Sequence, residues 1–170
     1  MRLQSRNAVL AACLLCSAWS GCRPSWQSDS FPATGRVTIN GEPPVGALVQ
    51  LIPVGDKQPD ERVSRPWGLV KEDGSFTLST YDGEPGAPPG EYAFTITWPP
   101  DASKPSTADR LRSRYTRPDQ SRWRFTIKEG DNVLPPVEMT GVDVDMKAGA
   151  SALPGPLQTT APTKPRKGRR

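Results

Sequence analysis

Histidine is absent from the 170-residue chain, and aromatic side chains make up only 7% of it. Without histidine the chain lacks the usual general base, the Ser-His and Cys-His nucleophile pairs and the commonest zinc ligand. Neither a G-x-S-x-G elbow nor a G-x-x-x-x-G-K-[ST] phosphate loop occurs in the sequence. We therefore expect no enzyme and no cofactor. A carboxylate pair such as Asp82 and Glu91 remains as the basis of an exported hydrolase, the less favoured alternative.

Cysteine is scarce, and its three copies all fall within the first 22 residues. Cys13 and Cys16 lie in an apolar segment that we expect to be removed, which leaves no cysteine pair for an internal disulfide. Twenty prolines and fifteen glycines interrupt the rest of the chain too often for long helices. Stability must therefore come from the packing of sheets.

Residues 1–21 have the pattern of an export signal, in which Arg2 and Arg6 precede a short apolar stretch. The end of this segment, W-S-G-C at 19–22, resembles the bacterial lipobox, although that pattern prefers an aliphatic residue where Trp19 stands. The resemblance implies that Cys22 is lipidated and holds the protein on a membrane of the cell envelope, on its periplasmic or surface face. The alternative is an ordinary signal peptide, which would release a soluble protein with Cys22 as a free thiol.

Positive charge is concentrated at the C-terminus. The formal charge is +4, but residues 151–170 carry five basic residues and no acid, and Arg2 and Arg6 leave with the signal, so residues 22–150 total −3. We interpret residues 141–170 as a disordered basic tail rich in proline and alanine. Its alternative role is weak attraction to anionic lipid, cell-wall polymer or nucleic acid, without specific recognition of nucleic acid.

Alternating polar and apolar residues predict strands separated by tight turns. Asn40-Gly41 and Asp73-Gly74 are typical of hairpin turns, so we expect the strands on either side of each dipeptide to pair as one hairpin. The strand at 91–98 carries four large side chains on one face and is the predicted centre of the core. The remaining strands are predicted at 36–39, 47–52, 67–70, 75–80, 122–127 and 133–139, with Pro135 and Pro136 placing the last one at a sheet edge or a bulge.

Seven short strands within about 100 residues favour a seven-stranded antiparallel β-sandwich over residues 33–140, with a closed barrel as the alternative. Residues 22–32 are polar and predicted to be a tether. Residues 99–120 are predicted to be a polar excursion between strands. We expect no further core after residue 140.

Aromatic side chains are the candidate contacts for a partner. Tyr92, Trp98 and Trp123 share strand faces with apolar residues and are predicted to pack in the core. Tyr81 and Tyr115 lie in predicted loops, and we expect them to be exposed and, together with Asp82, to contact a protein or glycan.

Carboxylates offer only weak candidates for a metal site. Asp82 with Glu84, or Asp143 with Asp145, can each supply oxygen ligands, but neither set reaches the six to eight oxygens that calcium takes. We therefore predict no metal site.

Several motifs in order give the chain a resemblance. They are G-R-V-T-I-N-G-E-P at 35–43, G-A-L-V-Q-L-I-P at 46–53, E-D-G-S-F-T-L-S-T-Y-D at 72–82 and G-A-P-P-G-E-Y at 86–92. Together they resemble the carboxypeptidase regulatory-like, transthyretin-like β-sandwich lipoproteins of planctomycete-type bacteria. The resemblance implies a fold and an envelope location, and it assigns no catalytic residue. We expect a noncatalytic module for protein or glycan interaction, with a structural envelope component as the alternative.

Overall fold

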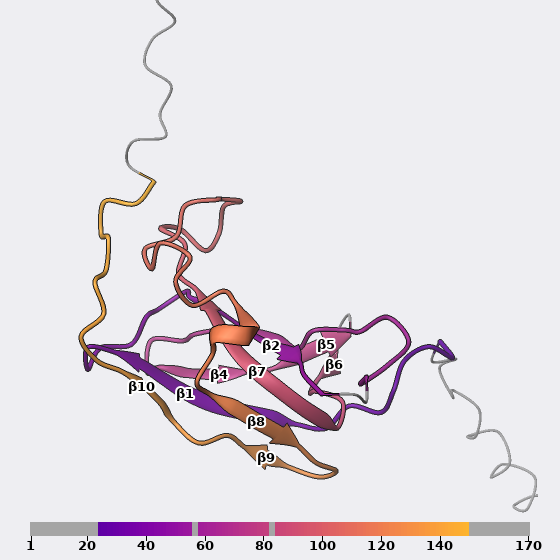
Figure 1. Cartoon of the computed structure of the whole chain (residues 1–170). Helices are drawn as coiled ribbons and strands as arrows, with labels where there is room; N and C mark the ends of the chain where they lie inside the picture. The colour runs from indigo at the N-terminus through magenta and orange to yellow at the C-terminus, as the bar shows by residue number, and fades with distance from the viewer. Residues whose placement is uncertain (1–23, 56–57, 82–83, 150–170) are drawn as a thin grey trace, which may run out of the picture.

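Strands arranged in two sheets make up the protein, as Figure 1 shows. The computed structural model describes residues 24–55, 58–81 and 84–149. The six-stranded sheet has the order β6 (Glu84–Pro85), β5 (Ser79–Tyr81), β3 (Trp67–Leu69), β2 (Leu48–Pro53), β7 (Gly90–Thr97), β8 (Arg124–Ile127). The second sheet is built around β1 (Ala33–Ile39), which pairs with β4 (Ser75–Thr77), β9 (Asn132–Val133) and β10 (Val137–Met139). The fold is all-β, and two sheets of this kind are compatible with a sandwich.

The core lies between the two sheets. From β7, Tyr92, Phe94 and Ile96 are almost completely buried, as predicted for the central strand. Val37 and Phe76 reach them from the opposite sheet and are equally buried. Ala93 and Thr95 on the other face of β7 are also buried. Both faces of β7 are therefore covered, whereas the sequence predicted burial of the one face that carries the large side chains.

The turn at Asn40-Gly41 forms, but the predicted hairpin between β1 and β2 is wrong. Both turn residues have positive φ, 53° and 89°, and Ile39 and Glu42 exchange two backbone hydrogen bonds across them. The next two residues are Pro43 and Pro44, which carry no N–H group and cannot extend the ladder. The chain therefore crosses to the other sheet, where β2 pairs with β3 and β7.

The second predicted hairpin is also wrong, because the strands on either side of its turn belong to different sheets. The Asp73-Gly74 turn is closed by a bond from the Lys71 N–H to the Ser75 carbonyl, 2.8 Å. However, β3 pairs within the six-stranded sheet and β4 pairs with β1. The predicted strand at 75–80 is divided at Leu78, whose N–H donates to Ala33 and whose carbonyl accepts from Gly86. Strands that bend in this way can serve two packed sheets.

The last predicted strand is divided as well. Its two parts, β9 and β10, run parallel to β1, so the prediction of an entirely antiparallel fold is wrong. Pro135 and Pro136 separate the two parts, and the edge position predicted from them is confirmed. Two divided strands and the unpredicted β6 give ten strands among the described residues where seven were expected.

Ordered packing extends beyond the predicted limits of the domain. Val142 belongs to the core, and the Asn40 side-chain amide donates to its carbonyl and accepts from its N–H. The prediction that the core ends at residue 140 is therefore wrong. At the other end, Phe31 in the predicted tether pairs with Ala87. Within the described residues no helix is long and apolar enough to cross a membrane.

Candidate functional site

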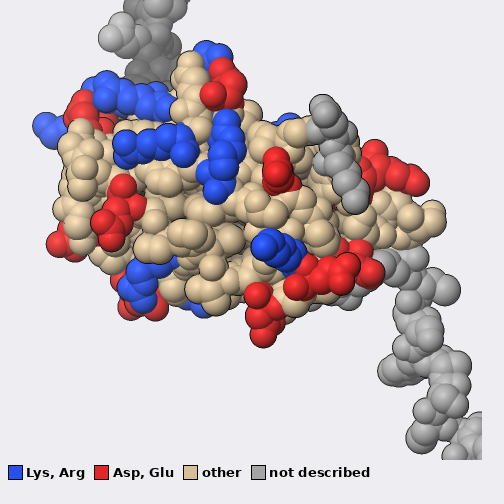
Figure 2. Space-filling view, turned by 60° about the horizontal axis from the view of Figure 1, so that its bottom comes forward, with Lys and Arg blue, Asp and Glu red and all other residues tan. Residues whose placement is uncertain are grey.

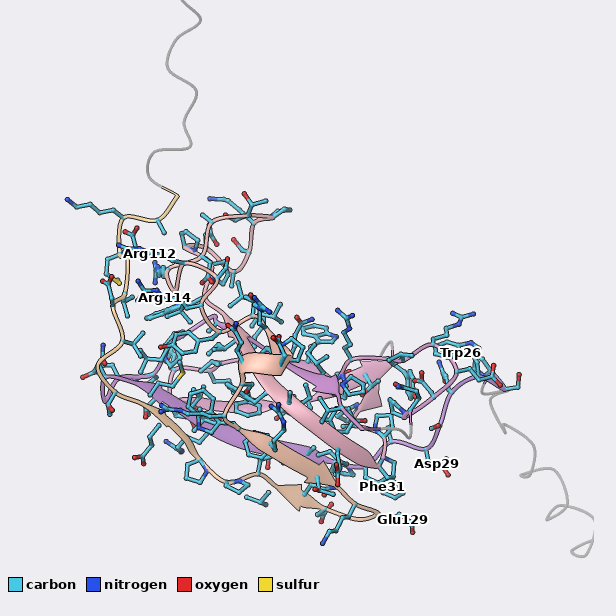
Figure 3. The ribbon with its side chains drawn as sticks, viewed as in Figure 1. Trp26, Asp29, Phe31, Arg112, Arg114 and Glu129 are labelled. Atoms are coloured by element: carbon cyan, nitrogen blue, oxygen red, sulfur yellow. The ribbon has the colours of Figure 1, made fainter. Side chains whose placement is uncertain are left out.

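The segment at residues 24–31, here called the N-terminal strap, packs against one end of the molecule (Figure 3). The Trp26 ring meets the Tyr81 ring edge-on, with 5.6 Å between centroids and 81° between planes. The Arg62 guanidinium lies 3.9 Å from the centroid of the Trp26 ring. The Ser28 hydroxyl donates to the Pro59 carbonyl. The strap is therefore held by side chains from β5 and from the loop after β2.

Tyr81 is buried, so the prediction that it is exposed is wrong. It ends β5 with 6% of its surface accessible, and its hydroxyl donates to Asp60 Oδ2 at 2.7 Å. The same hydroxyl accepts from the Ser28 N–H at 3.2 Å. The sequence alternation placed Phe76 and Leu78 inward, but the register shifts between Ser79 and Tyr81. That irregularity turns Tyr81 toward the interior.

Asp60 is the buried carboxylate under the strap. Its Oδ1 accepts from the backbone N–H groups of Arg62 (2.9 Å) and Ser64 (3.0 Å), while Oδ2 accepts from Tyr81. Burial by itself raises the pKa of Asp60, but hydrogen bonds from Ser64, Tyr81 and Arg62 outweigh it and hold that pKa below its ordinary value. Burial raises the pKa of the nearby Tyr92 phenol, and repulsion from Tyr81 once it is ionised and from the Asp60 carboxylate adds to this effect.

Replacement of Asp60 by Asn tests this arrangement. An amide nitrogen in place of Oδ1 faces the two N–H donors of Arg62 and Ser64. In place of Oδ2 it leaves the proton of the Tyr81 hydroxyl without its acceptor. We therefore expect the free energy of unfolding at pH 7 to fall by about 1–3 kcal/mol. Because the folded pKa is lowered, the advantage of the aspartate is present above the unfolded pKa and is lost as pH falls through the folded value. Urea denaturation at pH 7 and in steps below pH 4 measures the difference.

The neighbouring Glu61 provides the matched control, since its side chain is exposed. Glu61→Gln is expected to change stability by no more than about 0.5 kcal/mol. A difference between wild type and Asp60→Asn that stays constant down to pH 2 would contradict a role for the charged carboxylate.

Tyr115 is half-buried against the core and therefore less exposed than predicted. Its carbonyl accepts the N–H of Ile96 on β7, at 3.0 Å. Two further bonds continue this contact, from the Phe94 N–H to the Trp123 carbonyl and from the Arg110 N–H to the Trp98 carbonyl. Residues 110–124 therefore follow the edge of β7 beyond the point at which β8 begins, at Arg124. Trp98 and Trp123 pack partly against the core, and Tyr92 lies fully within it, as predicted.

Asp109 fixes the start of this segment and was not identified from the sequence. Its carboxylate accepts three backbone N–H groups, from Trp98, Leu111 and Ser113, at 2.8–3.0 Å. Leu111 is completely buried, so the predicted polar excursion contributes to the core. The signal available in the sequence was an aspartate followed closely by a leucine. It does not single out Asp109, because aspartates that accept hydrogen bonds from nearby backbone N–H groups are common in loops.

Arginine side chains gather along the same segment. Residues 110–124 include six arginines and one acid, and Figure 2 shows several Lys and Arg side chains side by side on the surface. Arg112 pairs with Asp143 (2.9 Å) and Asp145 (3.6 Å), which places these predicted calcium candidates in an ion-pair cluster. Arg117 pairs with Asp119 at 2.8 Å.

Three exposed arginines, here called the arginine row, make no ion pair with a described residue: Arg114, Arg122 and Arg124. The Arg122 guanidinium lies 4.4 Å from the centroid of the Trp123 ring. Arg124 donates to the Ser121 carbonyl at 2.7 Å. The sequence predicted a basic outer face for 122–127, but gave no signal that Arg114 lies along the same edge.

Two of the predicted site residues, Cys22 and Asp82, lie outside the described residues. The structure does not bring Tyr81 and Tyr115 together, since Tyr81 contacts the strap while Tyr115 lies beside β7. Among the described residues no three His, Cys, Asp or Glu side chains form a group able to hold a metal ion. Comparisons with family models, with curated proteins and with solved structures find no match to the chain.

Proposed function

We propose that the chain is a noncatalytic exported lipoprotein, anchored through Cys22, whose β-sandwich is an interaction module of the carboxypeptidase regulatory-like, transthyretin-like type. The two-sheet all-β fold supports the family assignment. The observation that carries the proposal is the docking of the N-terminal strap through Trp26, Tyr81 and Asp60. A module held at one end in this way presents its other surfaces to a partner.

Chain length limits the distance between the anchor and the domain. Only three residues separate Cys22 from Trp26, and an extended chain advances at most about 3.6 Å per residue, which gives a reach of about 14 Å. A lipid on Cys22 therefore keeps the strap end of the sandwich close to the membrane surface. Arg112 and Arg114 lie at the other end of the molecule from Trp26 and Asp29 (Figure 3). This geometry suits a module that contacts a protein or glycan on the side away from its membrane.

Intact-mass analysis of the protein extracted from cells tests the anchor. We expect the mass of a chain that begins at Cys22 and carries acyl groups, and recovery of that chain in the membrane fraction. Cys22→Ser is expected to abolish both the acyl mass and the retention on membranes. Cys16→Ser is the matched control, because residue 16 belongs to the predicted signal and its replacement should leave the mature mass unchanged. An unacylated mature chain, or one that retains residues 1–21, would contradict the proposal.

A further inference from the structure

We propose that the arginine row, together with the aromatic side chains between its members, binds an acidic polysaccharide whose sugars carry carboxylate groups. The inference rests on the proposed function and names the partner of the exposed end. The juxtaposition that carries it is a line of unpaired arginines and half-buried aromatic rings along one edge of β7.

Backbone hydrogen bonds set the order of these residues along the edge. Arg124 pairs with Ala93, Trp123 lies opposite Phe94, Tyr115 opposite Ile96, and Arg110 opposite Trp98. Strand residues advance about 3.3–3.4 Å each, so the part of this edge that carries the arginine row, from Ala93 to Ile96, extends about 10 Å. Such a length matches an extended polymer better than a single small anion.

The chemistry of the row suits carboxylates on sugar rings. Guanidinium groups form paired, charge-assisted hydrogen bonds with carboxylates. Arg114, Arg122 and Arg124 make no ion pair with a described carboxylate, although the charge of Arg124 helps to lower the pKa of Asp119. Arg122 is already stacked near Trp123, which reduces the side-chain freedom lost on binding. Trp123 and Tyr115 add flat, partly apolar surfaces beside the charges, and such rings can contact a sugar face.

The base of the C-terminal segment lies at the same end of the molecule. The Asp145 N–H donates to the Arg110 carbonyl, and the Gly149 backbone lies beside Pro100. The five basic residues of 151–170 follow directly in the sequence. These residues carry positive charge of their own, so the test has to separate their contribution from that of the row.

The position of the row favours a polysaccharide over the anchoring membrane. Arg114 lies away from the strap, whereas the proposed anchor is confined within about 14 Å of Trp26. Aromatic rings between basic side chains also suit single-stranded nucleic acid. An exported protein meets envelope polymers first, so the polysaccharide is the partner we propose, and nucleic acid becomes one outcome of the test.

The test measures binding of the full-length, detergent-extracted protein to fluorescently labelled polygalacturonate oligomers at 0.15 M salt. The same oligomers with every carboxylate methyl-esterified keep the sugar rings without the charge, and a 20-nucleotide single-stranded DNA represents nucleic acid. The triple variant Arg114→Gln/Arg122→Gln/Arg124→Gln is expected to raise Kd for polygalacturonate at least about tenfold, which equals about 1.4 kcal/mol. We expect no measurable binding to the esterified oligomers.

A matched variant, Arg65→Gln/Lys71→Gln/Lys128→Gln, removes three exposed positive charges outside the row. Screening at this salt reaches about 8 Å, so the matched variant should change Kd by less than about threefold. Both triple variants are repeated with Lys164, Arg166, Lys167, Arg169 and Arg170 all changed to Gln, which separates the row from the basic C-terminus. Unchanged melting temperatures establish that each variant is folded.

Three results would overturn the inference. They are equal losses in the two triple variants, tighter binding of DNA than of polygalacturonate, and loss of binding on neutralising the C-terminus with no effect of the row. If the protein is acylated and membrane-bound but fails the binding test, the proposed function stands and only the acidic polysaccharide is ruled out as its partner. If Cys22 is unmodified, the anchor is refuted whatever the sugar binding.

Discussion

Phe94→Ala is expected to lower the free energy of unfolding by about 3–5 kcal/mol, as is typical when a buried phenylalanine is truncated. The side chain is 1% exposed and lies at the centre of the core between the two sheets. Its ring meets Phe76, Trp123 and Phe125 at centroid distances of 6.4, 5.8 and 6.1 Å. β4 and the segment that forms β8 therefore both lose ring contacts, and the resulting cavity cannot be filled by a shift of one of them.

Urea denaturation of the full chain, followed by tryptophan fluorescence, measures this change. Val133→Ala is the control, because the Val133 side chain is 84% exposed and its truncation should cost no more than about 0.5 kcal/mol. A loss below 1 kcal/mol for Phe94→Ala would mean that Phe94 is not at the centre of the core.

Gly68→Ala is expected to destabilise the protein by about 2–3 kcal/mol, the upper part of the range for overpacking. A Cβ atom on Gly68 would lie 2.3 Å from the Thr77 carbonyl oxygen and 3.1 Å from its carbon. The obstacle is backbone, so no side chain can rotate away, and β3 must move relative to the end of β4. The close approach occurs where the chain leaves β4 and enters β5.

Leu69→Ala on the same strand provides the comparison for Gly68→Ala. Leu69 is 44% exposed, so its truncation is expected to cost about 1 kcal/mol or less. Thermal and urea unfolding should give the same order for the two variants. Equal effects of the two substitutions would show that β3 can shift freely against Thr77.

The sequence alone predicted local structure better than strand partners. Alternation identified β7 and β8, and the Asn40-Gly41 and Asp73-Gly74 dipeptides identified two turns that the structure contains. A turn dipeptide, however, indicates only the backbone conformation of its own residues and not which strands pair. After the first turn, Pro43-Pro44 end the pairing with β1, and this signal was present in the sequence. The bend at Leu78, by contrast, depends on packing across the core.

The candidate surfaces were predicted only in part. The outward arginines at 122 and 124 follow from the alternation of residues 122–127, because Phe125 and Ile127 occupy the inner face of β8. Arg114 joins them only because the Asp109 carboxylate folds residues 109–113 back toward Trp98. Tyr81 was misplaced because it was assigned to a loop, whereas β5 continues to Tyr81 and its register shifts between Ser79 and Tyr81. Long-range pairing of this kind has no signature in a single sequence.

The bend at Leu78 has a consequence for how the protein unfolds. Its N–H donates to Ala33 on β1, and its carbonyl accepts from Gly86, the residue after β6 of the six-stranded sheet, with N–O distances of 2.9 and 2.7 Å. Neither sheet can open at this point without disturbing a backbone bond that belongs to its neighbour. The amide protons of Leu78 and Gly86 should therefore exchange with solvent at the rate of global opening, as parts of one cooperative unit.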